Sequence, residues 1–138
     1  MTPEQKSLVQ GTFEQVVPIS EKAAELFYGR LFELDPSLRA LFKTNLREQG
    51  IKLMQTLGYC VARLDKLEEI LPAVRDLGKR HVKYGVSAAH YDTVGSALLW
   101  TLEQGLGPAF TPDVKEAWTM VYVTLSGVMK ESANSLQT

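Results

Sequence analysis

Residues 77–86 read LGKRHVKYGV and contain the more informative of the two histidines in the chain. His81 follows Leu77 by four residues and Val74 by seven, so its ring belongs to the apolar face of a helix. Gly85 is expected to end that helix. A histidine in this position can be a core residue or the ligand of a metal or cofactor, and the spacing alone leaves both interpretations open.

Helical spacing of apolar residues continues on both sides of this stretch. It groups Leu53 with Leu57 before it, and Tyr91 with Val94 after it. The alternation of apolar and polar residues that marks a half-buried strand is not sustained anywhere in the sequence. We therefore predict an all-α fold of six to eight helices. Capping residues predict helix starts at Thr2-Pro3, Ser20-Glu21, Asp35-Pro36, Ser87 and Thr111-Pro112.

Proline and glycine residues predict where the helices end. Stops are expected at the Leu71-Pro72 step and in the segment 105–108. The most polar and least periodic connector is the segment 44–48. His90 lies near the start of a predicted helix and is interpreted as an ordinary first-turn residue.

Length, charge and composition limit the class of protein. A chain of 138 residues suits one domain, 1–138, and a mean hydropathy of -0.08 is that of a soluble globule without a membrane span. A formal net charge of -1 offers no basic surface that would neutralise a nucleic-acid backbone, so we expect no nucleic-acid partner. The N-terminus lacks the basic-then-apolar order of a secretory signal, and we expect a cytoplasmic protein.

The chain has few residues that could hold a bare metal or support nucleophilic catalysis. Cys60 is the single cysteine, so it cannot form an intramolecular disulfide, and no Cys or His pair stands at metal-finger spacing. Any metal must therefore arrive with its own ligand cage or be held by isolated residues. No phosphate-binding, dinucleotide-binding or serine-hydrolase motif occurs, which argues against those enzyme classes.

Three further side chains occupy positions from which they could serve a site. Tyr28 adjoins the apolar face that carries Phe27, so its ring should be buried while its hydroxyl needs a partner. Gln49 precedes Leu53 by one helical turn, and Phe42 ends a short predicted helix. Each also has an ordinary interpretation: a tyrosine that bridges core and surface, a solvated first-turn glutamine, and a core phenylalanine.

Taken together, several short segments make the chain resemble the globin family, in particular bacterial single-domain globins, the haem domains of flavohaemoglobins, and neuroglobin. Each segment is loose by itself, but their order and spacing are specific, and they extend from near the start to about Met129. The segments are 26–32, 35–42, 77–86, 89–95, 106–111 and 117–122.

The resemblance implies a globin fold around a pocket for haem b (iron protoporphyrin IX). His81 would be the proximal ligand of the iron, and Phe42 the phenylalanine that packs flat on the haem. Tyr28 and Gln49 would face the sixth coordination site and donate hydrogen bonds to a bound gas. The resemblance also implies an apolar lining of Leu53 and Leu57 on the distal side and of Leu77, Tyr91 and Val94 on the proximal side.

Two positions depart from patterns that are common in the family. Gln49 stands where many globins have a distal histidine, so a second histidine ligand is not expected. Tyr91 matches the tyrosine of the proximal His-Tyr-Glu network of flavohaemoglobins, but Ala133 stands where the glutamate is expected, and Glu131 lies two residues away. The resemblance therefore leaves open whether the chain has the electron push of peroxidase or dioxygenase chemistry.

The resemblance implies one main function and two alternatives. The main expectation is reversible binding of dioxygen by a carrier, store or scavenger, with nitric oxide and carbon monoxide as further diatomic ligands. The first alternative is nitric oxide dioxygenation, which would need a separate reductase because the chain has no room for one. The second is gas sensing through a partner. A monomer or a weak homodimer is expected.

Overall fold

A computed structural model describes residues 2–42, 45–83 and 86–137 of the chain. Within these residues all regular structure is helical, which confirms the predicted all-α fold of six to eight helices. The α-helices are α1 (Pro3–Val16), α2 (Ser20–Leu34), α3 (Leu46–Ala62), α4 (Leu67–Lys83), α5 (Ala88–Leu106) and α6 (Pro112–Gln137). Short 3₁₀ turns connect them: η1 (Val17–Ile19), η2 (Pro36–Leu41), η3 (Leu64–Lys66) and η4 (Gly107–Ala109).

Capping side chains begin the first and fifth helices where the sequence predicts. The Thr2 hydroxyl accepts a hydrogen bond from the Gln5 backbone N–H at 3.1 Å, and the Gln5 side chain accepts one from the Thr2 N–H at 3.0 Å. Ser87 and His90 form the same reciprocal pair at the start of α5, where the Ser87 N–H donates to His90 Nδ1 at 3.0 Å. The interpretation of His90 as a first-turn residue is confirmed.

The predicted helix end at Pro72 is wrong, because α4 continues through this residue. The missing N–H of Pro72 removes one hydrogen bond close to the helix start, and the rest of α4 forms beyond it. The boundary between α3 and α4 comes earlier in the chain, at η3. No described helix of the chain is long and apolar enough to span a bilayer.

The predicted connector 44–48 is shorter than expected. The Asn45 side chain accepts a hydrogen bond from the Arg47 N–H at 2.8 Å, and α3 begins at Leu46. Most of the polar stretch therefore forms the first turn of α3. Thr44 and the predicted stop at Gly85 lie outside the described residues, whereas Gly107 ends α5 as expected, with a positive φ of 54°.

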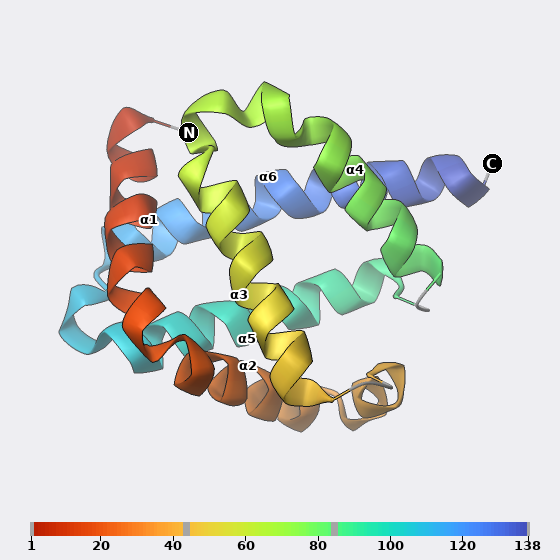
Figure 1. The fold of residues 1–138 in the computed structure, drawn as a ribbon, viewed down its shortest axis with the longest axis horizontal. Helices are drawn as coiled ribbons and strands as arrows, with labels where there is room; N and C mark the ends of the chain where they lie inside the picture. Colours follow the sequence, from red (N-terminus) through yellow and green to blue (C-terminus); the bar gives the residue numbers. More distant parts are fainter. Residues whose placement is uncertain (1, 43–44, 84–85, 138) are drawn as a thin grey trace.

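The helices pack around a core that joins residues far apart in the sequence. In Figure 1, α5 and α6 run across the molecule behind α3, and α4 crosses α6, with which it is in contact. Trp118 of α6 is almost completely buried, and its Nε1–H donates a hydrogen bond to the Thr12 hydroxyl of α1 at 2.9 Å. The core therefore fixes the long C-terminal helix against the N-terminal one.

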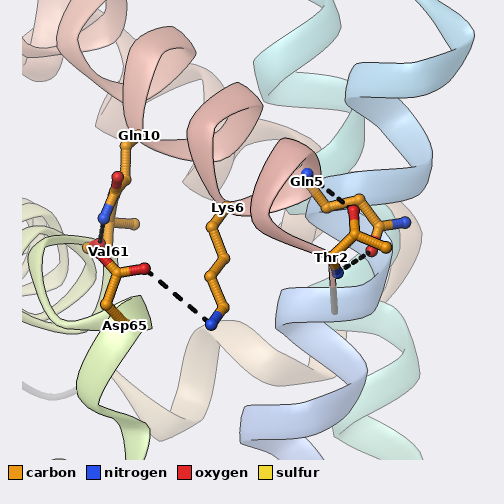
Figure 2. A network of polar contacts seen from close by, with 6 residues as sticks. All are labelled: Thr2, Gln5, Lys6, Gln10, Val61 and Asp65. Atoms are coloured by element: carbon orange, nitrogen blue, oxygen red, sulfur yellow. Dashed lines mark hydrogen bonds and ion pairs between the residues drawn. The ribbon is translucent and has the colours of Figure 1, made fainter.

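Polar contacts attach α1 to the end of α3 (Figure 2). The Gln10 side chain donates to the backbone carbonyl of Val61 at 3.0 Å, which satisfies a carbonyl near the end of α3. Lys6 lies 4.0 Å from the Asp65 carboxylate of η3. These contacts hold the corner from which the chain enters α4, the helix that carries His81.

Candidate functional site

His81 is a half-buried residue of α4, and its ring has a defined proton position. Its Nδ1 lies 2.7 Å from the backbone carbonyl of Leu77. A carbonyl oxygen only accepts, so Nδ1 carries the hydrogen and the lone pair is on Nε2, as in a histidine that ligates a metal. Burial lowers the pKa of His81, the nearby Arg80 charge acts in the same direction, and the bond to Leu77 opposes both. The ring is therefore neutral at pH 7.

The back of α4 is fixed tightly to α6. A Cβ at Gly78 would lie 2.6 Å from the backbone oxygen of Met129, so only glycine permits this helix crossing. The Ser132 hydroxyl of α6 donates to the Arg75 carbonyl at 2.7 Å, while Ile70 and Val74 are buried beside it. Leu77, by contrast, is half-buried and is in neither of the hydrophobic clusters formed by the described residues.

On the opposite side of the predicted pocket, Tyr28 of α2 is surrounded by aromatic rings. Its ring centroid lies 5.1 Å from that of Phe27, 6.1 Å from that of Phe32 and 5.3 Å from that of Phe42. Only 6% of Tyr28 is exposed, and burial raises its pKa to about 12. Its hydroxyl is therefore protonated at neutral pH and can donate a hydrogen bond.

The contact between α2 and α3 brings Gln49 into this region. A Cβ at Gly50 would lie 2.8 Å from the Ala24 Cβ of α2 and 3.8 Å from the Tyr28 ring, so the two helices approach closely at this glycine. Gln49 is half-buried in the first turn of α3, directly before Gly50. The structure thus brings the Phe42 ring against the Tyr28 ring. It also places Gln49 next to Gly50, the residue at which α3 approaches Tyr28.

The apolar residues predicted to line the pocket are partly covered. Leu53 and Leu57 of α3, Val94 of α5 and Phe42 after η2 are half-buried and pack against the main core. Half-buried apolar side chains from three elements, together with Leu77, match the walls that a flat apolar cofactor needs. Their common role with His81 as the lining of one pocket stays a prediction.

Tyr122 of α6 packs against the first turns of α5, where it contacts Tyr91 and Gly95. The Tyr122 hydroxyl donates to the backbone carbonyl of Tyr91 at 2.5 Å, and its ring packs over Gly95. The Tyr91 hydroxyl is buried and has no hydrogen-bond partner within the part of the chain that the structure describes. Burial also raises the pKa of Tyr91.

No carboxylate among the described side chains forms a hydrogen bond with the Tyr91 hydroxyl. Glu131 is exposed, and the side chain of Ala133 lies outside the described residues. Lys130 lies near Tyr91, with its Nζ 5.6 Å from the ring centroid and 3.9 Å from the Asp92 carboxylate.

The donor set fits haem better than a bare metal ion. No group of three or more His, Cys, Asp or Glu side chains that could hold a metal exists within the described ranges. A single neutral imidazole with apolar surroundings suits a metal that brings its own ring of ligands. Cys60 is buried with a raised thiol pKa, which matches its interpretation as a small core residue.

Sequence reasoning missed three contributors to this region. Phe32 lies one helical turn after Tyr28, a spacing that could have signalled the ring contact. Gly50 and Gly78 set the positions of α3 and α4, but a glycine within a helix gives no sign of the helix it will meet.

Comparisons with known proteins agree on one family. A family model described as Globin matches residues 25–129. Neuroglobin of Danio rerio is 27% identical over 94% of this chain and 90% of its own length. Flavohemoprotein of Bordetella bronchiseptica is 32% identical over 94% of this chain but only 33% of its own length. Flavohemoprotein of Bacillus subtilis is 33% identical over 79% of this chain and 29% of its own.

A solved structure shows the same fold along nearly the whole chain. A protein described as an engineered carbene transferase and putative nitric oxide dioxygenase from Rhodothermus marinus superposes with a TM-score of 0.89. The match covers 99% of this chain and 96% of the other, at 24% sequence identity.

Proposed function

Because this chain belongs to the globin family, we propose that it holds haem b through His81 and binds dioxygen reversibly, with Tyr28 and Gln49 as hydrogen-bond donors. Globins are haem proteins that interact with diatomic gases, and haem supplies the iron to which the gas binds. We further propose that the protein works in the cytoplasm. The remaining steps depend on this chain's own side chains.

On the proximal side, His81 would act as the ligand through Nε2. Its Nδ1–H donates to a neutral carbonyl, that of Leu77, which orients the ring and fixes its tautomer. A neutral acceptor draws the Nδ1 proton away from the ring less than a carboxylate would. This supports reversible gas binding over chemistry that needs a strongly electron-donating histidine.

The observation that carries the proposal is the state of Tyr28. Its phenol is buried, held by the rings of Phe27, Phe32 and Phe42, and protonated because its pKa is about 12. A packed donor needs little reorganisation to meet a polar gas molecule. A hydrogen bond to a charged partner contributes about 1.5–3 kcal/mol, which corresponds to a ten- to hundredfold effect on affinity.

Gln49 would contribute a weaker donor from the other helix. Its amide is half-buried, and its backbone lies at the start of α3, where Gly50 holds the helix against Tyr28. The apolar side chains of Leu53 and Leu57 would limit the entry of water beside it. The two donors therefore differ in how firmly the fold positions them.

Nitric oxide dioxygenation is the alternative that the comparisons favour. Flavohemoproteins are among the relatives, and the solved structure of the same fold is described as a putative nitric oxide dioxygenase. The same pocket could serve both functions, and the enzyme would need electrons from a reductase. The unpartnered Tyr91 hydroxyl supports oxygen binding as the first choice, because no described carboxylate extends the proximal network.

Absorption spectra of the purified haem-loaded protein in its ferric, ferrous, oxygenated and carbon monoxide forms test the proposal. We expect a stable oxygenated form that releases its gas reversibly and a ferrous form with an open or weakly held sixth position. A sharply split low-spin spectrum in the ferrous protein without gas would contradict it. Rapid catalytic consumption of nitric oxide with an added flavin reductase would favour the alternative.

A further inference from the structure

The outer face of α6 carries an unusual row of side chains. Glu116, Met120, Val123, Gly127 and Lys130 follow one another at alternating intervals of four and three residues. This is the spacing at which one helix packs along another in a coiled coil. Val123 is 58% exposed and Met120 is 40% exposed, so the apolar centre of the row faces away from the core.

A groove runs beside this row, between α5 and α6. Its volume is about 390 Å³, and it is lined by Asp92, Ser96, Leu99, Val123, Gly127 and Lys130 among others. A Cβ at Gly127 would meet no atom within 4 Å, so the space above this glycine lies outside the chain. The face therefore presents projecting apolar side chains and a hollow side by side.

We propose that this face binds a second copy of the chain, with the two α6 helices antiparallel and a two-fold axis close to Val123. Glu116 lies seven residues before Val123 and Lys130 seven residues after it, about 10 Å along the helix in each direction. In such a pair, Glu116 meets Lys130 of the partner subunit, and Met120 comes within about one residue of the level of the partner's Gly127, because they lie three and four residues from the axis.

The pattern selects a second copy because it is self-complementary. A two-fold interface uses the same patch on both subunits, so the patch must contain both members of each contact. Here one helix carries the acid and the base, and also the large apolar side chain and the glycine that leaves room for it. An unlike partner would not require opposite charges at equal distances from one centre.

The Lys130 side chain is held close to the position that Glu116 of the partner subunit would occupy in the dimer. Its Nζ lies 3.9 Å from the Asp92 carboxylate at the edge of the groove and 5.6 Å from the centroid of the Tyr91 ring. The lysine therefore lies along the groove and can bridge Asp92 and an incoming carboxylate. This arrangement does not involve the haem, so the inference stands independently of the proposed function.

The first test changes the centre of the face. Val123→Glu brings two carboxylates together at the axis and should raise the dimer dissociation constant by about a hundredfold or more. Val17→Glu is a matched control, because Val17 is a valine of similar exposure, 51%, on η1. Sedimentation velocity of the haem-loaded proteins over a concentration series measures the effect. A wild type that stays monomeric up to about millimolar concentration would overturn the proposal.

The second test uses the paired charges. Glu116→Lys and Lys130→Glu should each weaken the dimer by about tenfold, because like charges then face each other twice. The double variant restores opposite charges and should return to within about threefold of wild type. If the double variant instead loses as much dimerisation free energy as the two single variants together, the Glu116–Lys130 contact is not part of the interface.

Discussion

The two sides of the predicted pocket are built differently. On the distal side, Tyr28 is buried among rings from its own helix and from the residue after η2, and α3 meets α2 directly at Gly50. On the proximal side, α4 packs mainly against α6, and its inner face leaves Leu77 and His81 half-buried. Contacts within the protein thus position Tyr28, the proposed distal donor, whereas His81, the proposed proximal ligand, faces a region that the chain covers only in part.

This difference indicates a division of tasks between the two sides. Tyr28 is packed among aromatic rings in the protein alone, so as the proposed distal donor it would discriminate between gases without rearrangement. The inner face of α4 would gain its missing apolar contacts from haem, so binding the cofactor would also stabilise that helix. The four predictions that follow test this asymmetry.

Removing the imidazole should have the largest effect. His81→Gly should abolish stable haem binding or leave a haem that needs added imidazole, because no second histidine is available on the inner face of α4. The absorbance spectrum of the purified variant, with and without imidazole, measures this. An unchanged spectrum would show that another residue is the ligand.

Removal of haem should destabilise the proximal helix α4 more than the distal helix α2. Backbone amides of α4 should exchange with solvent about a hundredfold faster or more in the apo protein, whereas those of α2 should change much less. Hydrogen exchange followed by mass spectrometry compares the two helices within the same sample. Equal acceleration in both would refute the division of tasks.

The fit of α4 on α6 can be tested through glycine. Gly78→Ala should destabilise the protein by about 1–3 kcal/mol, because its Cβ would lie 2.6 Å from the Met129 backbone. Gly11→Ala in α1 is the control, since its Cβ meets nothing within 4 Å, and it should be neutral or stabilising by up to about 1 kcal/mol. Denaturant unfolding curves of both variants give the comparison.

Acid should act first on the proximal side. The folded pKa of His81 lies below its ordinary value of about 6.5, so the unfolded chain binds the proton more readily than the native one. The stability that neutral His81 provides is therefore present above about pH 6.5 and is lost as the pH falls below it. Unfolding of the haem-free protein, measured from neutral pH to about pH 4, should show this loss of stability. A stability of the haem-free protein that does not fall towards the acid end would contradict a lowered pKa of His81.

The local parts of this architecture can be predicted from the sequence. The capping pairs at Thr2 and Ser87 and the glycine end at Gly107 depend on neighbouring residues only. The family motifs place His81 and Tyr28 on their expected helices, whereas Phe42, expected at the end of a short helix, lies directly after η2. Pro72 is the exception, because tolerance of a proline near a helix start depends on the turn that precedes it.

The contacts that place the donors cannot be predicted in the same way. The approach of Tyr28 to Phe42 depends on how η2 folds back over α2, and the crossing at Gly78 depends on the position of Met129. Helical periodicity identifies the apolar face of each helix, but it does not identify the other helix against which that face packs. The role of each lining residue thus remains a prediction from the family resemblance.

In the proposed function, a pre-positioned Tyr28 hydroxyl stabilises bound dioxygen. Tyr28→Phe keeps the ring among its aromatic neighbours and removes only the donor, so the protein should fold and bind haem as before. Stopped-flow measurement should show dioxygen release faster by about ten- to a hundredfold, with a smaller change for carbon monoxide and a smaller acceleration in Gln49→Leu. Equal rates of dioxygen release from the wild type and both variants would show that neither Tyr28 nor Gln49 stabilises the bound gas.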